Sequence, residues 1–199
     1  MIKFQPDVAW QKYILGSAHL AGWMEDSKPI SSELLVSKRE LFSLIILAHI
    51  KNHIDNNNNW IVGYDTNASE PNDGFVSDGN LKIDVEHKII PQMNKQDPLD
   101  AILSTYGKYA SKGVAYGGDR TLIIHANIQT KGLIKISSLK DKISGACPFD
   151  RVLLMSAVAA HKNNIIPIHI TEHYPSFGIA QVDFNLLSGE ATIPHYGIK

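Results

Sequence analysis

Residues 70–90 read EPNDGFVSDGNLKIDVEHKII, and this stretch predicts a β-hairpin with one charged face. From residue 81 onward, apolar and polar side chains alternate, which is typical of a strand with one buried face. Asp78-Gly79, just before it, favours a two-residue hairpin turn, because such turns need positive φ at both central positions. The polar face carries Lys82, Asp84, Glu86 and Lys88.

A two-residue turn at Asp78-Gly79 would pair Asp73 with Asp84 across the hairpin. Glu86 would then be the diagonal neighbour of Asp73 on the same face, with backbone positions roughly 7–8 Å apart. Like charges directly opposite one another destabilise a sheet. A folding argument alone therefore does not favour this arrangement.

A divalent cation would remove the conflict, since carboxylate oxygens are the ligands that Mg²⁺ prefers. We therefore expect Asp73 and Glu86 to bind a metal, with Asp84 as a further ligand or a supporting acid. Lys88 follows on the same face and would orient a metal-bound water or help to deprotonate it. The alternative is a solvated hairpin face whose charges point into water.

The order Asp73, then Glu86-x-Lys88, resembles the Asp…(Asp/Glu)-x-Lys signature of the PD-(D/E)xK nuclease superfamily, over about residues 32–128. The usual proline directly before the aspartate is absent, since Asn72 stands there. The resemblance implies a restriction-endonuclease-like α/β fold, in which helices flank a mixed central β-sheet. It also implies an endonuclease that cleaves phosphodiester bonds with Mg²⁺, for which Mn²⁺ can substitute. DNA is the expected substrate, in restriction, repair or defence.

Two other interpretations stay open. The chain can be a catalytically inactive module of the nuclease fold that binds nucleic acid or protein without cutting. It can also be an unrelated α/β protein whose hairpin acids are solvated, in which case Mg²⁺ would not change its stability.

Local signals predict the elements around the hairpin. Asp97 can cap a helix, because Pro98 follows at the first helical position. The resulting order of a helix, three strands, a helix and a strand fits the nuclease core and also mixed α/β sheets in general. Residues 150–164 fit either a helix or a strand with a turn. The further predictions are helices over 6–24 and from Ser31 or Ser32 to about Ile54, and strands within 60–66, 121–128, 165–171 and 179–187.

Five more residues are candidates for the site. The resemblance suggests Glu40, on the long helix before the hairpin, as an additional ligand, although a solvated helix charge also explains it. Gln92 lies four residues past Lys88 and is a candidate to contact substrate, although a loop glutamine also explains it. Lys108 and Lys112 are spaced to hold phosphate oxygens from one helix, although a solvated helix face also explains them, and Tyr109 between them would stack or pack.

The chain has 199 residues and an ordinary composition, which predicts one domain. Within it we expect N-terminal helices over 1–54, a catalytic core over about 32–128 and a C-terminal extension over 133–199. The single cysteine excludes an intrachain disulfide and a zinc site built from several cysteines.

The charge is uneven, although the formal net charge is only −1. Residues 80–151 hold eleven Lys or Arg and seven Asp or Glu, a net of +4, which suits salt-sensitive contact with phosphates. A homodimer is expected, because two sites related by a two-fold axis can cut both strands of a duplex. The N-terminus lacks an apolar signal segment, and the run LFSLIILAHI is too short to span a bilayer. We therefore expect a cytoplasmic protein without membrane contact.

Overall fold

The computed structural model describes residues 2–14, 33–64, 74–90, 97–126, 136–143, 147–157 and 164–198. Its helices are α1 (Pro6–Tyr13), α3 (Glu33–Ile54), α4 (Pro98–Ala110), α5 (Val114–Gly117) and α6 (Ile136–Ile143). Its strands are β1 (Ile2–Phe4), β2 (Ile61–Tyr64), β3 (Gly74–Ser77), β4 (Lys82–Ile90), β5 (Thr121–Ala126), β6 (Arg151–Ala157), β7 (Ile165–Tyr174), β8 (Gly178–Asn185) and β9 (Ala191–Tyr196).

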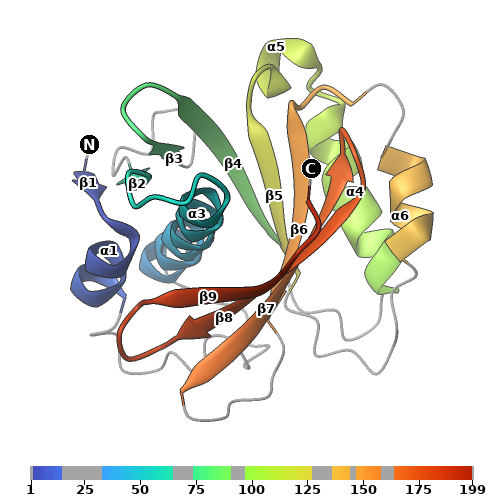
Figure 1. The fold of residues 1–199 in the computed structure, drawn as a ribbon. Coiled ribbons are helices and arrows are strands. Elements are labelled where there is room, and N and C mark those ends of the chain that lie inside the picture. Colours follow the sequence, from blue (N-terminus) through green and yellow to red (C-terminus); the bar gives the residue numbers. More distant parts are fainter. Residues whose placement is uncertain are drawn as a thin grey trace.

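All these strands belong to one sheet, in which they lie side by side in chain order from β1 to β9 (Figure 1). The central strands β4, β5 and β6 run parallel to one another. Every other neighbouring pair is antiparallel. Parallel neighbours need a crossover connection, and helices α4 and α6 lie in the two crossovers of this sheet. The prediction of a mixed α/β sheet flanked by helices is confirmed at this level.

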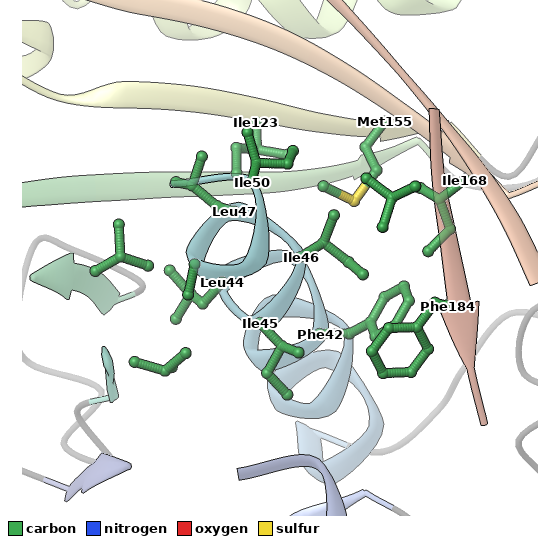
Figure 2. Close-up of a cluster of buried hydrophobic side chains, with 14 of the residues drawn as sticks. Phe42, Leu44, Ile45, Ile46, Leu47, Ile50, Ile123, Met155, Ile168 and Phe184 are labelled. Atoms are coloured by element: carbon green, nitrogen blue, oxygen red, sulfur yellow. The ribbon is translucent and has the colours of Figure 1, made fainter. Parts of the chain in front are cut away.

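Helix α3 is the centre of the larger hydrophobic core. Every residue from Leu41 to Ala48 is buried, because this segment is apolar around almost its whole circumference. Figure 2 shows its side chains reaching Ile123 of β5, Met155 of β6, and Ile168 and Phe184 of the C-terminal strands. The helix contacts both β2 and β9, which lie far apart in the strand order. The sheet therefore curves around α3.

Aromatic side chains close the open side of this core. Trp10 of α1 lies 4.6 Å from Phe184 of β8 and 5.7 Å from Phe42 of α3, measured between ring centroids. The Trp10 indole N–H donates to the carbonyl of Leu186, 2.9 Å away. The backbone of Gly189 passes so close to Trp10 that a Cβ there would lie 2.7 Å from the indole. These contacts fix α1 against α3 and against the turn between β8 and β9.

A second core lies on the opposite face of the sheet, under α4 and α6. Ile102 of α4 and Leu139 of α6 pack there against Leu122 and Ile124 of β5. Helix α4 starts as the sequence predicts, since the Asp97 carboxylate accepts a hydrogen bond from the Leu99 amide at 2.8 Å. Figure 1 shows α3 and the α4–α6 pair on opposite sides of the strands.

Most predicted elements are present where the structure describes them. The long helix from Ser31 or Ser32 to Ile54 corresponds to α3, and residues 150–164 begin with strand β6. The predicted order of a helix, three strands, a helix and a strand runs from α3 to β5, with the short α5 added before β5. The sequence interpretation missed β1, α6 and β9. Of the helix expected over 6–24, α1 covers the first part, and residues 15–24 lie outside the described ranges.

The predicted hairpin register is wrong by two residues. Ser77 pairs with Lys82 and Phe75 pairs with Asp84, so residues 78–81 form a four-residue loop. The loop is stabilised by the Asp78 carboxylate, which accepts from the amides of Asn80 at 2.9 Å and Leu81 at 2.7 Å. These hydrogen bonds lower the pKa of Asp78. Since side chains alternate with a period of two, the shift keeps the polar face intact but places Phe75, not Asp73, opposite Asp84.

Because α3 is enclosed on all sides, a cavity beside it should greatly lower the stability of the folded protein. Ile46→Ala should destabilise the protein by about 2–5 kcal/mol, because Ile46 is fully buried among side chains from the helix and the sheet. Leu187→Ala is the control, because Leu187 is 61% exposed and should change stability by less than about 0.5 kcal/mol. Urea unfolding of both variants measures the difference. Equal midpoints for the two variants would contradict the central role of α3.

Candidate functional site

Three of the predicted site residues lie on one face of β4. Glu86 pairs in register with Leu122 of β5, and Lys88 pairs with Ile124, so both side chains lie on the face that α4 covers. Val85, between Asp84 and Glu86, is buried on the other face against the α3 core. The alternation predicted from the sequence therefore sets the direction of Asp84, Glu86 and Lys88.

Glu86 is a buried carboxylate with a single described cation beside it. Its residue exposure is 2%, and its Oε1 lies 2.6 Å from the Lys88 ammonium nitrogen. Its Oε2 is buried and has no hydrogen-bond partner within the described ranges. Buried carboxylate oxygens without a partner carry a desolvation cost. The Oε2 atom is therefore suited to accept a further donor or a cation.

Asp84 lies further toward the turn on the same strand and is more exposed. Two residues along a strand separate its Cα from that of Glu86 by about 6.7 Å. Its Oδ1 lies 2.6 Å from the ammonium of Lys82, which also lies 4.7 Å from the centre of the Phe75 ring. Each acid on this face thus has a lysine two residues away as its ion-pair partner.

The other predicted ligands are not brought to this pair. Asp73 and Gln92 lie outside the described residues. Glu40 is on α3, which packs against the opposite face of the sheet from Glu86. Among the described residues, no three His, Cys, Asp or Glu side chains form a group that could hold a metal ion. The described part of the site therefore offers two carboxylates, Asp84 and Glu86.

The residues predicted to bind nucleic acid lie next to Lys88. The Lys88 ammonium is 4.9 Å from the centre of the Tyr109 ring, on α4. The ammonium groups of Lys108 and Lys112 lie 5.6 Å and 4.5 Å from the same ring. Cations over a ring face are attracted by its quadrupole. The predicted catalytic lysine and both predicted phosphate-binding lysines therefore lie around one aromatic ring, that of Tyr109.

The structure adds two residues that the sequence interpretation missed. Tyr116 of α5 lies 6.4 Å from Tyr109, centroid to centroid, and Lys112 lies 3.9 Å from the Tyr116 ring. The Arg120 guanidinium lies 5.1 Å from the same ring. Both residues belong to the stretch YGGDR (residues 116–120), which fits a phosphate-contacting turn as well as a loop that ends a helix. We call Lys88, Lys108, Tyr109, Lys112, Tyr116 and Arg120 the Lys–Tyr cluster.

A second buried carboxylate lies on the opposite face, within β7. Glu172 is fully buried, and its Oε1 lies 3.0 Å from Nε of Arg151. Burial raises the pKa of Glu172 from its usual 4.5 to about 7, and the charge of Arg151 opposes this rise. Val152 and Leu153 of β6 pair with Tyr174 and Glu172, so His173 is an extra residue that bulges from β7.

His173 faces the side of the sheet away from Glu172, and burial shifts its pKa in the opposite direction. Its Nε2 lies 2.9 Å from the Thr171 hydroxyl, and the residue is 2% exposed. Burial lowers the pKa of His173 from its usual 6.5 to about 4. Glu172 was not a sequence candidate, because an acid beside an apolar strand pattern gives no local signal of its burial.

Comparison with known proteins gives no relative. No protein-family model, no curated protein and no solved structure matches the chain. Of the helices in the described ranges, none has the length and hydropathy that crossing a membrane requires. Function must therefore be argued from the geometry of the site itself.

Glu172 predicts a pH dependence of stability. Between pH 4.5 and 7 the folded state keeps a proton on Glu172 that the unfolded state releases, so its contribution to stability is lost as the pH rises through this window. One pKa unit corresponds to about 1.4 kcal/mol, so the loss should be on the order of 3 kcal/mol. Glu172→Gln removes this pH-dependent loss, because glutamine does not titrate. The stability of the variant relative to wild type should therefore increase from pH 4 to pH 8.

The measurement is urea unfolding of wild type and Glu172→Gln across this pH range. His173 adds an opposite slope in both proteins, since its lowered pKa lets the unfolded state bind the extra proton below pH 6.5. The difference between the two proteins isolates Glu172. Glu190→Gln, at an exposed acid, is the matched control. A pH-independent difference between wild type and Glu172→Gln would contradict the assignment.

Proposed function

We propose that this protein is a divalent-metal-dependent nuclease that hydrolyses phosphodiester bonds, with DNA as its substrate. The observation that carries the proposal is the Glu86 carboxylate, which is buried beside Lys88 and holds one oxygen without a described hydrogen-bond partner. A buried carboxylate with a cation at 2.6 Å, beside further cations, is an arrangement that acid–base and phosphate chemistry uses.

Asp73, Asp84 and Glu86 are the proposed ligands of Mg²⁺ or Mn²⁺. Asp73 directly precedes Gly74, whose Cα pairs with Val85, the neighbour of Glu86 in the chain. The two described acids supply oxygen donors of the type that Mg²⁺ prefers. When bound, such an ion polarises the scissile phosphate and lowers the pKa of the attacking water. Gln92 lies outside the described residues and remains an additional candidate, whereas Glu40 lies on α3, which packs against the opposite face of the sheet.

Lys88 is proposed to act on the phosphate directly. Its ammonium contacts both the Glu86 carboxylate, at 2.6 Å from Oε1, and the Tyr109 ring, at 4.9 Å from the ring centre. Its side chain is 20% exposed, so a bound phosphate can reach it. A preorganised cation offsets the negative charge that develops on the phosphate during hydrolysis. The remaining cations of the Lys–Tyr cluster would hold neighbouring phosphates.

The element order supports a restriction-endonuclease-like core. Helix α3, strands β2 to β4, helix α4 and strand β5 follow the order that the family resemblance implies. The Glu86-x-Lys88 half of the motif lies on the third of these strands, beside a parallel neighbour. Fold order alone does not specify an activity, so the proposal depends on Glu86 and Lys88.

A second candidate is a module of the same fold that binds nucleic acid without cutting it. The observation that favours it is the ion pairing on β4, because both described acids already have a lysine partner. Such a protein would bind nucleic acid through the Lys–Tyr cluster and would show no metal-dependent turnover.

Cleavage assays separate these two candidates. Plasmid, linear duplex, single-stranded DNA and RNA should be incubated with Mg²⁺, Mn²⁺ or EDTA, and we expect cleavage of DNA only with metal. Glu86→Gln, Lys88→Ala and Asp73→Asn should each reduce the rate by about 100-fold or more. Glu190→Gln should cleave as wild type does. Full activity of Glu86→Gln, or activity in EDTA, would overturn the nuclease proposal.

Metal binding should also stabilise the folded protein. Millimolar Mg²⁺ or Mn²⁺ should raise the melting temperature of wild type, because the folded state assembles the carboxylates and the unfolded state does not. Glu86→Gln and Asp73→Asn should lose most of this rise, whereas Glu190→Gln should keep it. Thermal melts with metal and with EDTA make the comparison. Equal shifts in all four proteins would mean that these acids bind no metal.

A further inference from the structure

The two tyrosines of the Lys–Tyr cluster form a pair of neighbouring aromatic rings. Tyr109 and Tyr116 are both half-buried, and their rings come from the end of α4 and from α5. Their centroids are 6.4 Å apart and their planes differ by 31°. Tyr116 also packs on Phe149 of the second core, at 6.4 Å. The two rings are therefore neighbours, and both pack against the second core.

Cations surround both rings. Lys88, Lys108 and Lys112 lie around Tyr109, and Lys112 and Arg120 lie around Tyr116. Nearby acids are Glu86, which pairs with Lys88, the exposed Asp119, which precedes Arg120 in the chain, and the exposed Asp150, whose amide donates to the Arg120 carbonyl. Four cations thus stand against three acids. A cationic groove with stacking rings is the arrangement that binds single-stranded nucleic acid without sequence preference.

The distance between the two rings favours a single strand over a duplex as the ligand of this surface. Successive bases in one strand of a duplex are about 3.4 Å apart along the axis. Rings 6.4 Å apart match two successive bases only when the strand is unstacked and extended. A duplex has its bases paired and stacked inside, so it offers this surface phosphates, sugars and base edges but no free base face for stacking.

We propose that the Lys–Tyr cluster binds single-stranded nucleic acid, with one base stacked on Tyr109 and the next on Tyr116. Lys112 lies within 4.5 Å of both rings and contacts the phosphate between these bases. Lys88 then holds the adjoining phosphate beside Glu86. This inference rests on the proposed function and specifies its substrate as an unpaired strand or an unpaired end.

Fluorescence anisotropy in EDTA tests binding separately from cleavage. The probes are fluorescein-labelled (dT)12, the RNA strand (U)12, a duplex of the same length and an abasic 12-mer with the same phosphates. Both single strands should bind more tightly than the duplex. Stacking is worth about 1–3 kcal/mol per base, so the abasic strand should bind wild type at least roughly 5-fold more weakly than (dT)12.

Variants test whether the two tyrosine rings contribute to the binding affinity. Tyr109→Leu and Tyr116→Leu should each weaken (dT)12 binding roughly 5- to 100-fold without changing its salt dependence, and Tyr109→Phe should keep it. Lys112→Ala should lower the slope of log affinity against log salt by about 0.7. Lys12→Ala, on α1, is the lysine control and should bind as wild type does.

The outcomes separate this proposal from the nuclease proposal. Equal binding of the abasic strand and (dT)12 by wild type, or tighter binding of the duplex, would overturn the stacking proposal even if a leucine variant failed to fold. Unchanged affinity in both folded leucine variants would do the same. Cleavage lost in Glu86→Gln would then still support the nuclease. Base-dependent binding without any cleavage would instead remove the nuclease and retain the stacking site.

Discussion

The fold depends on the burial of α3 from all sides. Between Leu41 and Ile50 the helix carries only Ser43 and His49 as polar residues, so it has no face that water could cover. A flat sheet can bury one stripe of a helix, whereas this helix needs apolar cover around its whole circumference. The sheet meets this need by curving, and β2 and β9 reach the helix from opposite ends of the strand order. Helix α1, with Trp10, covers what the strands leave open.

This constraint also determines where the charges of β4 lie. The α3 face of the strand is occupied by Val85, so the charged residues must lie on the other face. There the two acids lie between two lysines, in the order Lys82, Asp84, Glu86, Lys88, and each acid pairs with its own lysine. The crowding of like charges that the sequence suggests is therefore compensated within the strand. The buried Oε2 of Glu86 still has no hydrogen-bond partner within the described residues.

The features that could be predicted are those that a local sequence pattern determines. The faces of β4 followed from a period of two, and the start of α4 followed from Asp97 and Pro98. The hairpin register did not, because the Asp78 side chain binds two loop amides and this favours a longer loop than the dipeptide signal indicates. The apolar run of β6 fits a helix as well as a strand, since periodicity cannot separate them over a short segment. Tyr116 and Glu172 depend on contacts between distant segments, which no local pattern encodes.

The two buried glutamates show why the candidate site belongs on the α4 face. Burial raises the pKa of Glu172, the charge of its described cation Arg151 opposes this rise, and the negative charge of Asp150 adds to it. An approaching polyanion would meet net negative charge there whenever Glu172 is ionised. Glu86 has Lys88 at 2.6 Å, and the other cations of the Lys–Tyr cluster extend from there along α4 and α5. A nucleic acid can approach a buried carboxylate only where cations outnumber the acids. Of these two glutamates, Glu86 alone meets that condition.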